Sequence, residues 1–299
     1  MEWIGSGFLA SGAATTEEDV TQAALPFDAR RHGMIIGMGA VGLVVEADSE
    51  TTARGMKPIA RLLATEVCNS AFHGSRLDVD HIAATMQKLV GKTGLTPADV
   101  AAKTVFMSHE TYTPARGGSA SAEIHALRAA FGTGANRVVV ANTKGFTGHP
   151  QGAGIEDAVV LKALQRGTVP AIPNLQQPDP ELGDLNLSKG GAYDVQYALR
   201  LAAGFGSQVA MTFTQLVAKE NERVADQTTY DAWLNRVAGS SQLETVNRTL
   251  RVMDSGAPAS SPAPEPVAAE PAPTATPTTS DALAKVTAVI AEKLSLIHI

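Results

Sequence analysis

Cysteine is almost absent from this sequence, which has only Cys68 among 299 residues. One cysteine cannot form an internal disulfide or build a cluster of thiolates around a metal. Positive charge is also scarce, because 24 Lys and Arg face 30 Asp and Glu and the formal net charge is −6. The sequence also has no basic run, so the composition argues against a nucleic-acid partner. We therefore predict neither a nucleic-acid partner nor a metal site.

Long apolar stretches are missing as well. No run approaches the roughly 20 residues that a membrane-spanning helix needs. The apolar first residues also lack the positive charge that begins a signal peptide. We therefore expect a cytoplasmic protein without a membrane span, and the 44% of hydrophobic residues is enough for a sizeable core.

Proline, alanine, serine and threonine dominate residues 255–280. Such a stretch cannot bury a core and favours an extended chain, so we predict a linker. Apolar residues at helical spacing follow it and predict the start of a further domain, truncated by the end of the sequence. The predicted organisation therefore has four parts, namely residues 1–218, 219–254, 255–280 and 281–299.

Strand-like and helix-like segments alternate through residues 1–218, which is typical of a layered α/β fold. The segment 219–253 is predicted to be helical, with aromatic and apolar side chains on one face. The predicted strands are residues 33–47, 58–67, 104–108, 137–142 and 208–214, and the predicted helices are residues 78–90, 120–131 and 154–165.

The run from Gly37 to Gly42 reads GMGAVG and matches the pattern of a dinucleotide-binding turn. That site needs a helix to begin at the turn, so that its N-terminus meets the pyrophosphate. The continuation LVVEA is strand-like instead. We therefore predict that the glycines allow a close approach of neighbouring backbone. A dehydrogenase remains an alternative, and NAD binding would support it.

Cys68 follows a predicted strand and has no base close to it in the sequence, so a structural thiol is the simpler interpretation. Asp78 stands where a helix N-cap is wanted. The spacing of His73, Asp80 and His81 around it fits no standard metal motif.

Two histidines follow predicted strands in loops rich in threonine and glycine. His109 lies in SHETYTP, and His149 lies in NTKGFTGHPQGAG. Strand ends in open α/β folds are where functional sites gather. On spacing alone, convergence of both histidines on one acyl group competes with ordinary surface or core positions.

These two segments resemble the ketosynthase (β-ketoacyl synthase) family of the thiolase superfamily. That family has one histidine in H-G-T-x-T-P and another in K-x-x-x-G-H, and further matches lie at residues 26–46, 169–175 and 204–206. The resemblance covers roughly residues 20–218, in the family's order. The matching motif residues are His109, Thr111, Thr113, Pro114, Lys144, Gly148 and His149.

The resemblance implies an incomplete αβαβα fold, comprising the C-terminal half and the end of the N-terminal half. It also implies a decarboxylative Claisen condensation of an acyl thioester with a malonyl-type extender. His109 and His149 would stabilise the enolate, with Lys144 beside them. The implied supporting roles are pantetheine contacts for Thr111 and Thr113, an aromatic gate for Phe205, and a carboxylate partner of Lys144 for Glu156.

By the same resemblance, no cofactor binds directly. Phosphopantetheine arrives on an acyl carrier protein, and the parent protein forms a homodimer. The segment 230–252 resembles the region after the ketosynthase in synthases of polyunsaturated fatty acids and glycolipids. Residues 281–294 resemble the approach to an acyl carrier protein, so we expect a piece of a multidomain synthase.

The sequence also departs from the family pattern. The nucleophile motif, a cysteine between small residues, is not found, and Cys68 lies well after the segment where it is expected. Without that thiolate, the isolated chain is predicted to be inactive in condensation. A partner subunit that binds pantetheine and dimerises without condensing is the alternative. Glu110 replaces a usual glycine, and Ser207 follows the GFG turn where a glycine is usual.

Overall fold

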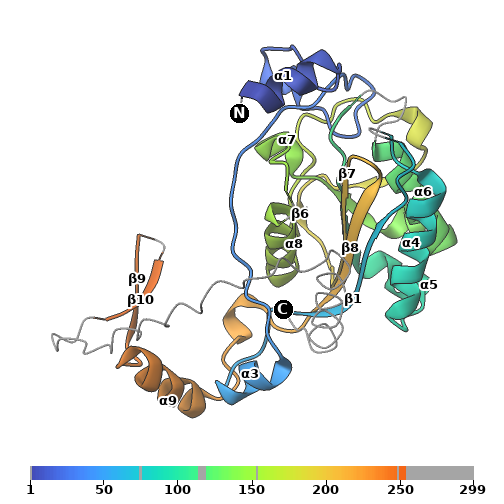
Figure 1. The fold of residues 1–299 in the computed structure, drawn as a ribbon. Coiled ribbons are helices and arrows are strands. Elements are labelled where there is room, and N and C mark those ends of the chain that lie inside the picture. Colours follow the sequence, from blue (N-terminus) through green and yellow to red (C-terminus); the bar gives the residue numbers. More distant parts are fainter. Residues whose placement is uncertain (1, 74–75, 114–118, 153, 248, 254–299) are drawn as a thin grey trace, which may run out of the picture. The chain divides into compact units, whose positions relative to one another are not determined.

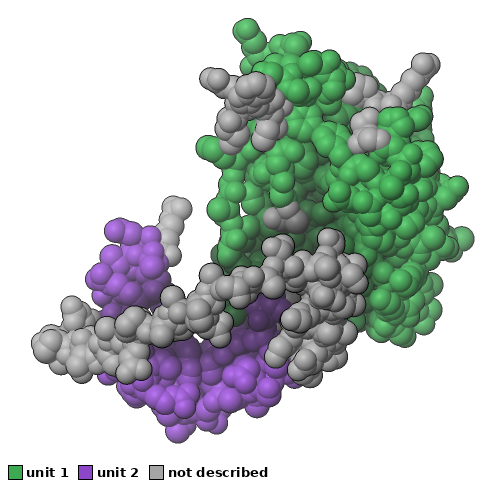
Figure 2. Space-filling model, in the orientation of Figure 1, with its two compact units in different colours: residues 1–44, 59–220, 299 green, residues 45–58, 221–298 purple. Residues whose placement is uncertain are grey.

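The computed structural model describes residues 2–73, 76–113, 119–152, 154–247 and 249–253. Pro114, the predicted linker at 255–280 and the segment 281–299 lie outside the described residues. Two compact units divide the described part, as Figure 2 shows by colour. The first unit is formed by residues within 2–44 and 59–220, and the second by residues within 45–58 and 221–253.

A six-stranded mixed sheet forms the centre of the first unit (Figure 1). Four of its strands are parallel, and the remaining two form an antiparallel edge. Parallel neighbours need long crossovers, which the intervening helices supply. In spatial order the strands are β1 (Ala60–Asn69), β8 (Gln208–Leu216), β7 (Tyr197–Gly204), β2 (Thr104–Met107), β3 (Val139–Ala141) and β5 (Asn186–Leu187).

Helices cover both faces of this sheet (Figure 1). Helices α4 (Val79–Lys92), α5 (Pro97–Val100) and α6 (Ser119–Phe131) lie on one face, and α8 (Ile155–Arg166) lies on the other. Alternate strand residues point to opposite faces. Phe106 therefore packs in the cluster with α4 and α6, whereas Val105 packs in the cluster with α8. The resulting α/β/α layers agree with the predicted layered fold.

Shorter elements complete the two units. In the first unit they are α1 (Glu2–Ala10), α2 (Val20–Ala23), η1 (Ala101–Lys103), η2 (Gly132–Arg137), α7 (Lys144–Thr147), β4 (Thr168–Val169), η3 (Pro180–Leu182) and β6 (Gly191–Ala192). In the second they are α3 (Asp48–Ala53), α9 (Gln227–Ala238), β9 (Leu243–Val246) and β10 (Thr249–Val252), with η4 (Glu220–Glu222) at the junction in sequence. No helix of the described residues is long and apolar enough to cross a bilayer.

The helical prediction for residues 219–253 was wrong over most of its length. Helix α9 ends at Ala238 because Gly239 adopts a left-handed conformation, with φ of 78°. Residues rich in threonine, valine and leucine then form the β9–β10 hairpin. Within the second unit, Trp233 of α9 stacks on Tyr230 and carries the Arg54 guanidinium over its ring at 5.4 Å.

The predicted strand at 33–47 is also absent. Among the described residues 33–45, only Met34 and Ile36 form β-type pairs, and each is an isolated bridge instead of part of a strand. A strand requires a neighbour that satisfies its backbone groups. Met38 and Val44 are 79% and 77% exposed, so the described chain supplies no such cover here. The strand-like pattern therefore does not produce a strand in this chain.

Candidate active site

The two loop histidines meet at one edge of the sheet. His109 follows β2 by two residues, and His149 follows α7, which begins shortly after β3. Because β2 and β3 are parallel neighbours, their carboxyl ends lie together. The imidazole ring centroids of His109 and His149 are 5.3 Å apart, with the rings nearly perpendicular at 85°.

A buried carboxylate on α6 holds the His109 loop. The Ser108 hydroxyl donates to Oε2 of Glu123 at 2.6 Å, and the His109 backbone N–H donates to the same oxygen at 3.0 Å. Burial raises the pKa of Glu123, and the Ser108 hydrogen bond only partly offsets this effect. The arrangement fixes the backbone from which the His109 ring projects.

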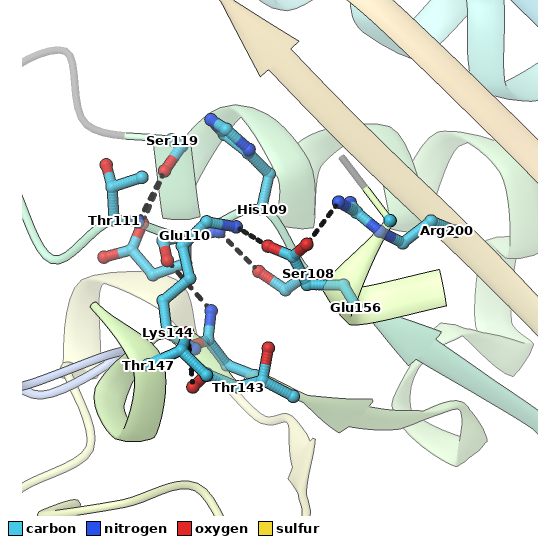
Figure 3. Close-up of polar contacts among 12 residues, drawn as sticks. Ser108, His109, Glu110, Thr111, Ser119, Thr143, Lys144, Thr147, Glu156 and Arg200 are labelled. Atoms are coloured by element: carbon cyan, nitrogen blue, oxygen red, sulfur yellow. Dashed lines mark hydrogen bonds and ion pairs between the residues drawn. The ribbon is translucent and has the colours of Figure 1, made fainter. Parts of the chain in front are cut away.

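Glu110, the residue that replaces the family glycine, points into the protein and does not line the cavity described below. Its carboxylate accepts from the Ser119 hydroxyl at 2.7 Å (Figure 3). It also accepts from the Tyr112 N–H at 3.1 Å. Nε of Arg31 lies 3.7 Å from the same carboxylate. Burial raises the pKa of Glu110. Glu110 therefore acts as a buried anchor for the loop and does not contribute to the cavity wall.

Direct hydrogen bonds join the two histidine loops. The Asn142 amide donates to the Glu110 carbonyl at 2.9 Å, and its oxygen accepts from the Lys144 N–H at 2.8 Å. The Tyr112 hydroxyl donates to the Lys144 carbonyl at 3.2 Å. Tyr112 is fully buried at a φ of 46°, a conformation that most side chains disfavour. The packed surroundings therefore hold the loops in one relative position.

A buried charge cluster of Lys144, Glu156 and Arg200 lies close to His109 (Figure 3). Nζ of Lys144 is 2.6 Å from Oε1 of Glu156, and Nη2 of Arg200 is 3.2 Å from Oε2. All three side chains are at most 3% exposed. Burial raises the pKa of Glu156, but the charges of Arg200 and Lys144 outweigh burial and leave that pKa below its usual value. Burial lowers the pKa of Lys144.

The same surroundings keep both imidazoles neutral. Burial, followed by the Lys144 charge, lowers the pKa of His149 to about 4 and holds the pKa of His109 well below its ordinary value. A neutral imidazole carries one N–H donor. No side chain of the described residues hydrogen-bonds to either ring. Each ring can therefore donate to a bound molecule.

A cavity of about 1050 Å³ opens in front of the histidines. Its lining includes five of the seven predicted site residues, namely His109, Thr111, Thr113, His149 and Phe205. The other two, Lys144 and Glu156, lie behind this wall. Phe205 is 59% exposed, and its ring stacks on Phe8 at 5.7 Å between centroids. Ser207 adopts a positive φ of 58°, and its hydroxyl accepts the Asp78 N–H at 2.9 Å.

Gly37 holds the His149 loop by close backbone contact. Its N–H donates to the His149 carbonyl at 2.9 Å, and the His149 N–H donates to the Ile35 carbonyl at 2.7 Å. A Cβ on Gly37 would lie 1.9 Å from the Thr147 carbonyl oxygen. This geometry confirms the predicted close approach of backbone at Gly37, whereas Gly42 of the same run has no atom of the described residues within 4 Å of an added Cβ.

Gly37→Ala is therefore expected to lower the free energy of unfolding by about 1–3 kcal/mol, because the clash must be relieved by moving backbone. Urea denaturation measures the change. Gly42→Ala is the matched control, since no atom lies within 4 Å of its added Cβ. Equal stability of the two variants would contradict the packing role of Gly37.

Sequence reasoning assigned no role to Glu123, Asn142 and Arg200. Arg200 carried the clearest signal, because it is a charged residue inside the apolar run YALRLAAG. In the sheet it stands opposite Met107, two residues before His109. That register depends on the pairing of β7 with β2, which no local pattern predicts.

Comparison with known proteins agrees with this geometry. Residues 60–176 match the family described as beta-ketoacyl synthase, C-terminal domain. The 3-oxoacyl-[acyl-carrier-protein] synthase 2 of Staphylococcus aureus strain COL is 31% identical over 212 residues, which cover 69% of this chain and 50% of the relative. The chain thus spans about half the length of the curated relatives it matches.

Solved structures share the fold. A type II polyketide ketosynthase, determined with its acyl-carrier protein and bound to the hexaketide, aligns with a TM-score of 0.64 and 26% identity, over 72% of this chain and 52% of that chain. A beta-ketoacyl synthase from Burkholderia phymatum STM815 aligns with a TM-score of 0.66 and 24% identity, over 73% and 52%. The sequence match, the relatives and the layered sheet agree that this chain carries a C-terminal ketosynthase domain of the thiolase superfamily.

Proposed function

We propose that this domain performs the decarboxylation of a malonyl-type thioester within a condensing enzyme of the 3-oxoacyl-[acyl-carrier-protein] synthase type. The observation that carries the proposal is the pair of neutral imidazoles, 5.3 Å apart, at the wall of one cavity. Loss of CO2 moves an electron pair toward the thioester carbonyl and builds negative charge on its oxygen. Fixed N–H donors, shielded from water, stabilise such a charge strongly.

His109 and His149 are assigned as the two donors to this enolate oxygen. The buried cluster of Lys144, Glu156 and Arg200 supports them electrostatically, because its positive charges help to keep the imidazoles neutral. Arg200 also reaches the cavity wall. Lys144 is thus a positioning and electrostatic residue that does not line the cavity. The enolate carbon is then ready to attack an acyl thioester, which completes the condensation.

We further propose that the extender reaches the cavity on the phosphopantetheine arm of an acyl carrier protein. Thr111 and Thr113 supply hydroxyls along the wall, and Phe205 stands exposed on the same wall. A ketosynthase with the same fold was solved with its acyl-carrier protein, which supports this choice of partner. A multidomain parent and its homodimeric state remain predictions.

Incubation of the chain with malonyl-acyl carrier protein tests the proposal. We expect formation of acetyl-acyl carrier protein, which mass spectrometry of the carrier protein detects. A partner subunit that only holds pantetheine would bind the carrier protein and leave the malonyl group intact. That outcome would replace the decarboxylase proposal by the scaffold alternative.

The rate of decarboxylation is expected to stay constant between pH 5 and pH 8. An ordinary histidine, with a pKa of about 6.5, would change its charge within this range. The pKa of His149 lies at about 4, and that of His109 is also well below its ordinary value. Both rings therefore remain neutral throughout this range, and protonation begins only as the pH falls toward 4. An inflection near pH 6.5 in the rate would contradict the buried, neutral state of the pair.

A further inference from the structure

A second pair of reactive side chains lies outside the histidine pair. Sγ of Cys68, near the end of β1, is 3.2 Å from Nε2 of His81 on α4. The same sulfur is 3.4 Å from the Thr85 hydroxyl, one turn further along α4. A thiol within hydrogen-bond reach of an imidazole is the arrangement of an activated nucleophile. The sequence interpretation of Cys68 as a structural thiol missed this base, because His81 approaches only when α4 packs on β1.

The helix holds His81 firmly in place. Asp78 caps the start of α4 and accepts the His81 N–H at 3.2 Å, while the Thr85 hydroxyl donates to the His81 carbonyl at 2.7 Å. The Asp78 N–H in turn donates to Ser207 in the turn that follows Phe205. The backbone that carries the imidazole is therefore fixed on a helix that is tied to the cavity wall.

Cys68 is reachable from the cavity that contains the histidine pair. It is half-buried, and it lines this cavity together with its neighbours Val67 and Asn69. Apolar side chains of Leu77 and Val209 line the same space. A molecule held against the histidines and extending along the cavity would meet both an apolar wall and a thiol.

We propose that Cys68, with His81 as its base, accepts an acyl group from a thioester bound in this cavity. The thioester class rests on the proposed function. In the step, His81 Nε2 takes the thiol proton and the Cys68 sulfur forms a bond to the carbonyl carbon. The carbon–sulfur bond of the incoming thioester breaks, and the departing thiolate takes the proton back from His81. The exchange is neutral in electrons and requires no further reactant.

The test uses the full chain and a hexanoyl thioester of N-acetylcysteamine as the acyl donor. We expect a single hexanoyl adduct, located by peptide mass spectrometry on Cys68 and released by neutral hydroxylamine. Cys68→Ala is expected to abolish the adduct. His81→Gln is expected to slow acylation about 10²-fold or more, the usual contribution of a positioned general base.

His125→Gln serves as the matched control, because His125 is exposed on α6. This variant should be acylated on Cys68 at the same rate as the unchanged chain. Circular dichroism melting confirms that each variant is folded. Absence of the adduct on the folded chain would overturn the proposal, as would equal acylation rates of His81→Gln and the unchanged chain. Malonyl decarboxylation is read separately as carrier-bound acetyl product, so failure of either proposal is distinguishable from failure of the other.

Discussion

His149→Ala is expected to slow decarboxylation of malonyl-acyl carrier protein by about 10²–10³-fold, the cost of removing one fixed donor from a developing oxyanion. The same loss is expected for His109→Ala, since the two rings flank one position at 5.3 Å from each other. Initial rates of acetyl-acyl carrier protein formation, measured at saturating substrate, report the change in kcat. Binding of the carrier protein should change much less, because the donors act on charge that forms during the reaction.

His149→Asn provides the sharper comparison. An asparagine keeps an N–H donor but has no titratable ring, so this variant should retain more activity than His149→Ala. His125→Ala, on the exposed face of α6, should leave the rate unchanged. If His149→Ala and His125→Ala had the same rate, the histidine pair would have no part in the decarboxylation.

Glu156→Gln is expected to lower the free energy of unfolding by about 3–5 kcal/mol, the usual loss when a buried ion pair is left with an uncompensated charge. The glutamine preserves the shape of the side chain and removes its charge. Lys144 and Arg200 then remain as two cations, at most 3% exposed, without their shared anion. Urea denaturation, with the midpoint and slope both fitted, measures the loss.

Glu220→Gln is the matched control, because Glu220 also bridges two cations, Lys162 and Arg166 of α8, but does so at the surface. Exposed ion pairs contribute little, so this variant should unfold almost like the unchanged chain. Equal losses for Glu156→Gln and Glu220→Gln would mean that the buried cluster is not the electrostatic centre described above. A second readout, the pH dependence of decarboxylation, should move only in Glu156→Gln.

The positions of the histidines could be predicted from local sequence, whereas their support could not. His109 and His149 each follow a strand in a recognisable loop, and the strands are neighbours. Arg200 and the Cys68–His81 contact depend instead on which distant strand or helix packs alongside. Such pairings are decided by how the whole chain folds. The residues next to Arg200, Cys68 or His81 in the sequence do not indicate which strand or helix will pack beside them.

The two wrong assignments have different physical origins. Residues 219–253 were read by apolar spacing, and the left-handed Gly239 ends the helix before the hairpin begins. Residues 33–47 have strong strand composition, but composition does not create a neighbouring strand. In the first segment the local sequence itself decided the outcome, through Gly239 and the strand-forming residues after it. In the second, the lack of a neighbouring strand decided it.

The bridge between Ile36 and His149 joins positions that are far apart in the chain. Closing such a long loop costs entropy before any contact repays it, so we expect the His149 loop to be secured late in folding. Arg200 and Phe205 are synthesised later still. The paired imidazoles are therefore expected to assemble late in folding, and a nascent chain that has formed only α4 and α6 has no place to hold a thioester.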